Sequence, residues 1–241
     1  MGTILIVNAC RYAGPDAIKA LGGETHQLFC HDASFADTTA RTAFENNNPD
    51  VKALSSTSPE DAVAEVLESV QVIDVLFCNH FQPPEMKPLK ETDDELFRAT
   101  LETLLVEPYQ FIKAALPALE ASEQARIILV TSAAPLRPGA NVSLYTAARA
   151  GANSMVESLA KELGPSGITV FGIAPNYYAS DDTYSQTVFA KSERFRASVE
   201  RNVPLKRLSN AHEMPRLIRY LCLDDSAFMT GQVIAFTGGW G

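Results

Sequence analysis

The sequence has no long hydrophobic run and no excess of basic residues. No apolar run in its 241 residues reaches about 18, the length of a membrane-spanning helix, so we expect no such helix. An apolar strand pattern begins at Thr3, which leaves no room for a signal or transit peptide, and we expect a cytoplasmic protein. With 20 Lys and Arg against 29 Asp and Glu, the formal net charge of -9 disfavours binding to nucleic acids and to anionic membranes.

Cysteine is scarce, and its spacing disfavours two kinds of site. The four cysteines lie far apart and form no Cys-x-x-Cys pair: Cys10, Cys30, Cys78 and Cys222. This spacing is typical of reduced, buried residues, and it predicts neither a disulfide framework nor a zinc site.

Short apolar runs alternate with amphipathic helical patterns along the whole chain. We expect strands at Thr3 to Asn8, His26 to Cys30, Val51 to Leu54, Val72 to Cys78, Arg126 to Ser132, Thr169 to Ile173 and Val233 to Phe236. Helices are expected at Pro15 to Leu21, Asp37 to Asn46, Pro59 to Ser69, 93 to 120, 143 to 163 and between Gln186 and Leu223. The alternation predicts one α/β domain over residues 1–241, a Rossmann-like doubly wound parallel sheet with helices on both faces. Ligands of such sheets bind beyond the carboxyl ends of the strands.

A hydroxyl, a phenol and a guanidinium are placed to converge in the central stretch, Arg126 to Gly164. Ser132 falls where an apolar strand stops, and Tyr145 and Arg149 are four residues apart on one face of the following helix. A permanent positive charge within a few ångströms favours the phenolate form of a tyrosine, and a nearby serine can hold a substrate oxygen while the tyrosine removes its proton. This arrangement predicts a general-base site.

Each of these residues also has a purely structural interpretation. Ser132 can be a strand-end cap, Tyr145 a half-buried aromatic residue, and Arg149 a solvated helix residue. For one residue alone the structural interpretation is the commoner one, but the spacing of all three favours a site.

The whole chain, from Ile4 to Trp240, resembles the short-chain dehydrogenase/reductase family. Asn79 falls where that family's fourth strand ends in an Asn-Asn-Ala-Gly run, and Ser132 and Tyr145 fall on its catalytic serine and tyrosine. Ala174-Pro175 matches its Pro-Gly turn, and Phe236-Thr237-Gly238-Gly239 matches its last strand and turn.

The departures from that family concern the dinucleotide site. The family's first turn has three glycines that let the backbone approach the pyrophosphate, and here Asn8 and Tyr12 replace the first two while Gly14 remains. Arg149 stands where the family has a lysine that holds the nicotinamide ribose, and Asn176 replaces the glycine after Pro175. Leu104 aligns with the asparagine of the family's proton relay.

These changes resemble the halohydrin dehalogenases, the branch of this superfamily that uses no nicotinamide and has a halide pocket in its place. The resemblance implies a catalytic triad of Ser132, Tyr145 and Arg149, and no cofactor or metal. It implies a halide pocket of Tyr12, Pro175, Asn176, Tyr177 and Tyr178, although an ordinary loop aromatic and an ordinary turn remain the alternatives. Asn79 and His80 are implied as a proton relay, with a packed histidine as the alternative for His80.

The resemblance implies a reaction on vicinal haloalcohols that releases halide and forms an epoxide. In reverse, a small anion such as azide, cyanide or nitrite would open the epoxide. The leaving halide would meet backbone amides of residues 176 to 178 and the edge of the Tyr12 ring. The helices of residues 93 to 120 and 143 to 163 would pair between subunits of a homotetramer.

Two other functions remain open. One is an NAD(P)-dependent short-chain oxidoreductase with an unusual cofactor turn, which the fold favours and the four departures disfavour. The other is a non-catalytic, ligand-sensing relative, because fold alone does not guarantee chemistry. A binding protein has no need of a tyrosine beside an arginine, so the retained Ser132, Tyr145 and Arg149 argue against it.

Overall fold

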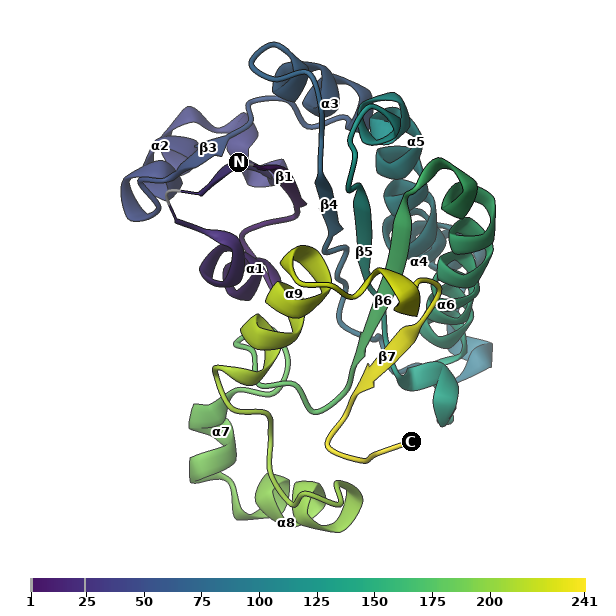
Figure 1. Cartoon of the computed structure of the whole chain (residues 1–241). Coiled ribbons are helices and arrows are strands. Elements are labelled where there is room, and N and C mark those ends of the chain that lie inside the picture. Colours follow the sequence, from purple (N-terminus) through teal and green to yellow (C-terminus); the bar gives the residue numbers. More distant parts are fainter. Residues whose placement is uncertain (1, 24) are drawn as a thin grey trace.

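Seven parallel strands form one sheet in the computed structural model, which describes residues 2–23 and 25–241 (Figure 1). Their order is β3-β2-β1-β4-β5-β6-β7, and each neighbouring pair is parallel. The strands are β1 (Gly2–Val7), β2 (His26–His31), β3 (Val51–Ala53), β4 (Val75–Cys78), β5 (Arg126–Val130), β6 (Thr169–Pro175) and β7 (Val233–Phe236). The chain builds outward in one direction from β1 and in the other from β4, so the topological switch point lies between these two strands.

Helices cover both faces of the sheet, as the alternating pattern predicted. On one face lie α1 (Gly14–Leu21), α2 (Thr38–Asn47) and α9 (Glu213–Leu223), and on the other lie α3 (Pro59–Leu67), α5 (Glu107–Glu120) and α6 (Ser143–Leu163). The predicted Rossmann-like, doubly wound parallel sheet is therefore confirmed.

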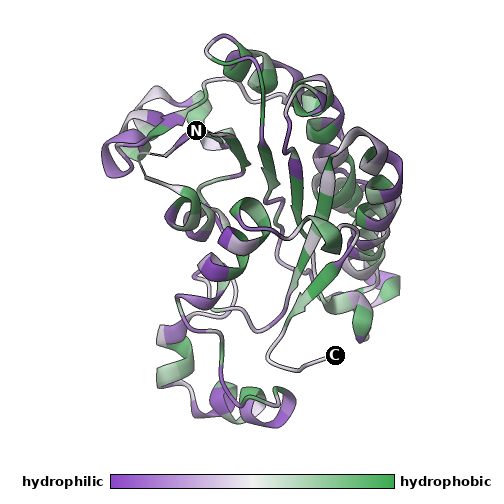
Figure 2. Ribbon diagram, viewed as in Figure 1, coloured by the Kyte–Doolittle hydropathy of each residue, from purple (hydrophilic) through white to green (hydrophobic). Residues whose placement is uncertain are grey.

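Each face of the sheet has its own apolar core. Ile4 and Ile6 of β1 pack with α1 and α9, whereas Leu5 and Val7 of the same strand pack with α3, α5 and α6. Successive side chains of a strand point to opposite faces, so a strand covered on both sides is apolar at every position. Figure 2 shows the resulting hydrophobic colour along the central strands.

Most elements begin and end within two residues of their predicted bounds, and two differ more from the sequence prediction. The strand expected from Val72 begins only at Val75, because the N–H of Ile73 donates to the carbonyl of Ala118 in α5 and not to a neighbouring strand. The helix expected over 93 to 120 consists of α4 (Asp94–Leu101), a π-helical segment (Glu102–Val106) and α5. The proline at 108 has no N–H to donate, which favours a wider turn just before it.

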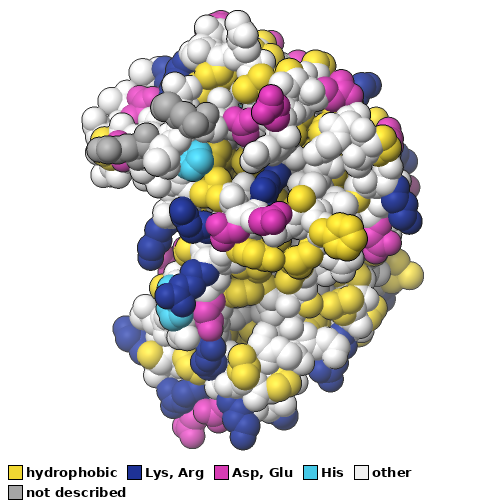
Figure 3. Space-filling view, viewed as in Figure 1, with side chains coloured by type: hydrophobic (Ala, Val, Ile, Leu, Met, Phe, Trp, Pro, Cys, Tyr) yellow, Lys and Arg dark blue, Asp and Glu magenta, His cyan; other side chains and the backbone are white. Residues whose placement is uncertain are grey.

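The segment between β6 and α9 extends beyond the carboxyl ends of the strands. It carries α7 (Gln186–Lys191) and α8 (Glu193–Asn202), whose apolar side chains pack around Val199, Val203 and Leu208. Lys and Arg side chains gather at this lower end of the molecule in Figure 3. Over the residues that the structure describes, no helix combines the length and the apolar character that crossing a membrane requires.

Candidate active site

A cavity of about 500 Å³ opens at the carboxyl ends of the strands and brings together most of the predicted site residues. Ser132 and Tyr145 line it with four predicted pocket residues, Tyr12, Pro175, Asn176 and Tyr177. The remaining lining residues are Phe81, Pro83, Pro84, Met86, Ala134, Arg137, Gly139, Val142, Asp182, Thr183, Tyr184 and Trp240. Its size suits a small organic ligand, because such pockets measure about 300–1,000 Å³.

Ser132 lies two residues beyond β5 and is oriented by its own loop. Its Oγ accepts the N–H of Ala134 at 3.1 Å, and its carbonyl accepts Nδ2 of Asn153 in α6 at 3.2 Å. The side chain is only 5% exposed, and among the described residues its hydroxyl proton has no acceptor. That proton is therefore available to a ligand oxygen in the cavity.

Arg149 lies beneath Tyr145 and is buried, so the interpretation as a solvated helix residue is wrong. Its side chain is 1% exposed, and its Cζ atom is 5.4 Å from the centre of the Tyr145 ring. The guanidinium donates to the carbonyls of Val130 at 3.1 Å and His80 at 3.0 Å. Among the described residues no carboxylate forms an ion pair with it, so its charge acts in a poorly hydrated place beside the phenol.

The turn between β1 and α1 has the left-handed backbone conformation that glycine favours, although larger residues occupy it. Asn8 and Tyr12, which replace two glycines of the family turn, have φ angles of 57° and 50°. Such left-handed conformations are uncommon for residues other than glycine. At Gly14 the glycine itself is required, because a Cβ atom there would lie 2.3 Å from the carbonyl oxygen of Ala9.

The Tyr12 ring fills the space above this turn. It stacks on Phe81 with ring centroids 4.2 Å apart and meets the Tyr178 ring edge-on at 5.2 Å. Burial raises the pKa of Tyr12, so its phenol stays neutral.

The residues of this site do not fit a nicotinamide dinucleotide. Tyr12 occupies the turn through which the backbone would approach the pyrophosphate. The carboxylate that could bind a ribose at the end of β2, that of Asp32, is already used by Ser34 and by the N–H of Cys10. Arg149 is turned into the core, away from the cavity where a ribose-binding lysine would act.

The turn after β6 offers fewer amides to an anion than the sequence predicted. The N–H of Asn176 donates to the carbonyl of Phe236 at 3.1 Å, and the N–H of Tyr177 donates to the Asn176 side chain at 2.9 Å. The amide of Tyr178 is the one of the three without a hydrogen bond among the described residues. Tyr177 has a φ angle of 53°, so this turn is also strained.

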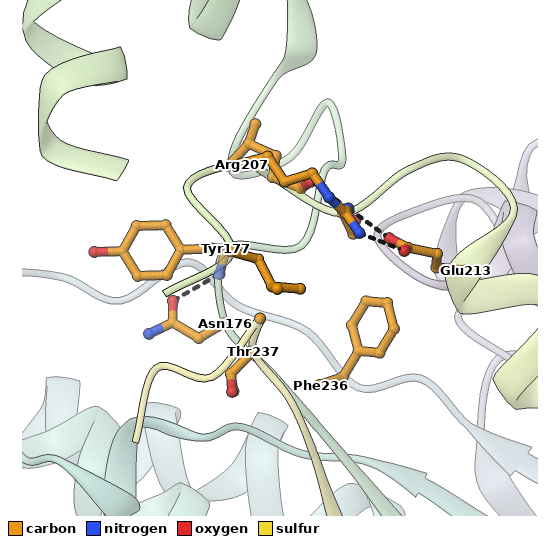
Figure 4. Close-up of a pocket in the computed structure, with 10 residues that line it drawn as sticks. Asn176, Tyr177, Arg207, Glu213, Phe236 and Thr237 are labelled. Atoms are coloured by element: carbon orange, nitrogen blue, oxygen red, sulfur yellow. Dashed lines mark hydrogen bonds and ion pairs between the residues drawn. The ribbon is translucent and has the colours of Figure 1, made fainter. Parts of the chain in front are cut away.

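A second, smaller cavity of about 110 Å³ lies against the same turn. Asn176 and Tyr177 line both cavities, and Figure 4 shows the ring of Tyr177 pointing away from the ion pair of Arg207 with Glu213. The two hydrogen bonds of that pair measure 2.7 and 2.9 Å, and the hydrogen bond from Arg207 lowers the pKa of Glu213 to about 2. The small cavity contains neither Ser132 nor Tyr145, so the larger one is the candidate site.

Tyr178 lies behind the cavity and does not line it, which differs from the predicted pocket. Its side chain is 3% exposed, and its hydroxyl lies 2.7 Å from Oδ2 of Asp16 and 3.2 Å from the carbonyl oxygen of Tyr12. Its ring supports the Tyr12 ring from the side of the core.

Asn79 has a structural place that differs from the predicted proton relay. Its Nδ2 donates to the carbonyls of Asn8 and Arg11, and its Oδ1 accepts the N–H of Ala13. Both polar atoms of the Asn79 side chain are thus used in hydrogen bonds to the backbone of the turn that carries Tyr12.

His80 is buried at 1% exposure, with Nε2 3.8 Å from Oε2 of Glu107. Burial, with His31 and Arg149 nearby, lowers the pKa of His80 to about 3, so its ring is neutral near pH 7. Neither ring nitrogen has a hydrogen-bond partner among the described residues. This environment favours the packed histidine, because a neutral ring that relays a proton needs a hydrogen-bond partner on each nitrogen.

Several lining residues were not singled out from the sequence. Trp240 reaches the cavity from the end of the chain and lies edge-on to Tyr177 at 6.2 Å, and Arg137 lies over its ring at 5.8 Å. Tyr184 and Asp182 come from the loop after β6. In the sequence, the signal that could have found them is the occurrence of aromatic residues shortly after the end of a strand. Leu136, which follows β5 closely, is 56% exposed and is not among the residues that line the cavity.

The fold and the Ser132–Tyr145 arrangement define a member of the short-chain dehydrogenase/reductase superfamily. Residues 33–241 match the family described as enoyl-(acyl carrier protein) reductase, and the chain belongs to this family.

Two relatives that are similar in sequence are described as a reductase and a reductase homolog. The chain is 30% identical over 190 residues to a 3-oxoacyl-[acyl-carrier-protein] reductase, FabG, of Salmonella typhimurium, covering 77% of this chain and 75% of the relative. It is 30% identical over 155 residues to a tropinone reductase homolog of Arabidopsis thaliana, covering 64% of this chain and 57% of that protein.

Two similar solved structures are dehalogenases. One, described as a dehalogenation enzyme, is 35% identical with a TM-score of 0.92, covering 100% of this chain and 98% of the other. The second is the halohydrin dehalogenase HheC bound to ethyl (2S)-oxiran-2-ylacetate, which is 29% identical with a TM-score of 0.94, covering 99% and 97% of the two chains.

Proposed function

We propose that this protein is a halohydrin dehalogenase that converts vicinal haloalcohols to epoxides without a nicotinamide cofactor. One observation carries the proposal: the ring of Tyr12, in the place of a cofactor-turn glycine, lines the same cavity as Ser132 and Tyr145. The likeness to two dehalogenase structures over nearly the whole chain supports it.

In this mechanism Ser132 and Tyr145 both bind the substrate hydroxyl. The charge of buried Arg149 favours the phenolate of Tyr145, which removes the hydroxyl proton. The substrate oxygen then attacks the neighbouring carbon. The new C–O bond forms as the carbon–halogen bond breaks, and the halide leaves with the bonding electrons. Each turnover yields one epoxide, one halide ion and one proton.

The halide leaves toward the wall formed by Tyr12 and the turn after Pro175. The positive edge of the Tyr12 ring, which lines this wall, stabilises the halide there. In the reverse direction the same wall holds azide, cyanide or nitrite for attack on an epoxide.

The proposal includes a homotetramer in which α4, α5 and α6 pair between subunits. Light scattering of the purified protein measures this state, and a monomer at working concentration would contradict it.

A nicotinamide-dependent oxidoreductase is the second candidate. The match of residues 33–241 to a reductase family and the likeness to the Salmonella typhimurium reductase favour it. The misfit of the dinucleotide at Tyr12, Asp32 and Arg149 disfavours it.

One experiment separates the candidates. The protein is incubated with a vicinal bromoalcohol, with no cofactor added, while free bromide and pH are followed together. The dehalogenase proposal predicts equal amounts of bromide and acid, and inhibition by added bromide. An oxidoreductase would react only after NAD or NADP is supplied, and a ligand-sensing relative would react in neither case.

A further inference from the structure

The backbone of Tyr12 is held by residues that follow β6 and lie far away in the sequence. Its N–H donates to Oδ2 of Asp182 at 2.6 Å, across 170 residues. Its carbonyl oxygen lies 3.2 Å from the hydroxyl of Tyr178. Both peptide groups of Tyr12 therefore contact the segment that continues into the loop before α7.

This N–H belongs to the turn that precedes α1, where a dinucleotide-binding protein holds pyrophosphate. Backbone N–H groups and the positive end of the helix favour a negative charge at this place. The charge is supplied here by the chain itself, because the carboxylate of Asp182 accepts the N–H. Among the described residues Asp182 has no Lys or Arg ion-pair partner, so the turn is the place to which its charge is directed.

The loop tied down in this way carries part of the cavity wall. Asp182, Thr183 and Tyr184 all line the cavity. The hydroxyl of Tyr184 donates to Oδ1 of Asn176 at 3.2 Å, and its ring stacks on Tyr177 with centroids 5.0 Å apart. Closure of the loop therefore also positions the turn of Asn176 and Tyr177.

We propose that Asp182 is a positioning residue whose carboxylate takes the place of a cofactor phosphate at the β1–α1 turn and thereby holds the 179–185 loop closed over the cavity. In a cofactor-dependent site the anion at this turn is the pyrophosphate of a bound dinucleotide. Here the anion is the carboxylate of Asp182, which belongs to the chain and is always present. The loop is closed without a cofactor, and the amide of Tyr12 is not available to a second anion.

Three variants isolate this contact. Asp182→Ala removes the acceptor and the charge, and Asp182→Asn removes the charge but keeps an acceptor. Asp181→Ala removes an equal charge from the neighbouring position, whose side chain makes no hydrogen bond among the described residues. Hydrogen–deuterium exchange of the 179–185 loop and of residues 10 to 14 is measured on the full chain of each variant.

The expected result is exchange about 10-fold faster in Asp182→Ala than in Asp181→Ala at both segments, with Asp182→Asn in between, as for the loss of one charge-assisted hydrogen bond. Equal exchange in Asp182→Ala and Asp181→Ala overturns the proposal. This readout needs no enzyme activity, so it stands even if the proposed function fails.

The consequence for binding rests on the proposed function. Comparison of the two neutral variants separates the hydrogen bond from the charge. In Asp182→Ala the KM for a bromoalcohol and the bromide concentration for half-inhibition are expected to be several-fold higher than in Asp182→Asn, with kcat changed less. A loss confined to kcat would contradict a positioning role through the loop.

Discussion

The guanidinium of Arg149 lies 5.4 Å from the centre of the Tyr145 ring, and its hydrogen bonds go to two backbone carbonyls, those of Val130 and His80. The two carbonyl oxygens accept hydrogen bonds from Nη1 and Nη2 but do not cancel the charge, and Nε has no hydrogen-bond partner among the described residues. The positive charge therefore acts on the phenol of Tyr145, whose ring it faces. This relationship underlies the first two predictions.

Replacement of Tyr145 by Phe or of Ser132 by Ala is expected to remove nearly all halide release from a simple substrate such as 1,3-dichloro-2-propanol. For the tyrosine the scale is set by general-base contributions of about 10²–10⁴-fold. Initial rates of halide release measure the effect, with circular dichroism to check the fold. A folded Tyr145→Phe protein that keeps more than about a tenth of the rate, far outside that range, would exclude the phenol as the base.

Replacement of Arg149 by Met is expected to lower activity near neutral pH and to recover part of it at higher pH. Without the charge, the negative charge that develops as the substrate hydroxyl loses its proton is less well stabilised, and a higher hydroxide concentration partly replaces the lost effect. The pH profile of kcat/KM measures the shift, and Arg149→Lys, which keeps the charge, is the matched control. A uniform loss with an unchanged profile would mean that Arg149 acts only on the fold.

The purified protein is expected to bind neither NADH nor NADPH. The Tyr12 ring stacks on Phe81 over the turn, and the carboxylate of Asp32 already accepts three hydrogen bonds. Isothermal titration calorimetry with each dinucleotide tests this, with a cofactor-dependent reductase measured in parallel as a positive control. Micromolar binding of either dinucleotide would be incompatible with the proposed site.

The stability of the protein is expected to fall as the solution becomes more acidic, in part because of His80. Burial lowers the pKa of His80 from 6.5 to about 3. Below pH 6.5 this histidine therefore binds a proton in the unfolded chain but stays neutral in the folded chain. The stabilising contribution is complete above 6.5 and is lost as the pH falls toward 3.

The free energy of unfolding is measured with urea between pH 6.5 and pH 4.5, the ordinary pKa values of histidine and glutamate. Most carboxyl groups titrate below this window, so the change within it reports mainly on histidine. His80→Gln is expected to reduce the loss of unfolding free energy over that window by about 2 kcal/mol. An unchanged slope would show that His80 is protonated in the folded protein. His31, whose pKa burial also lowers, contributes in the same direction and remains in the variant.

Much of the fold could be predicted because its signals are local. The strands covered on both faces are apolar at every position, as in β1, where Ile4 and Leu5 serve opposite cores. Helix starts were equally clear, as at Ser58, which caps α3 by accepting the N–H of Asp61 at 3.2 Å. The π-helical segment before the proline at 108 was missed, because a wider turn leaves the apolar pattern of the helix nearly unchanged.

The sequence by itself determined which chemical groups are available: Ser132 after a strand, Tyr145 with Arg149 one turn further on a helix, and Tyr12 in a turn that normally needs glycine. Only the tertiary structure decided what surrounds them. In the structure Arg149 is buried with no carboxylate of the described residues paired to it, and the side chain of Asn79 binds the backbone of the turn. Tyr178 lies behind that turn, and Asp182 and Trp240 reach the cavity. These contacts join residues far apart in the chain, such as Tyr12 and Asp182. The spacing of residues along one helix or strand carries no information about such partners, because they meet only when the sheet and its loops have packed.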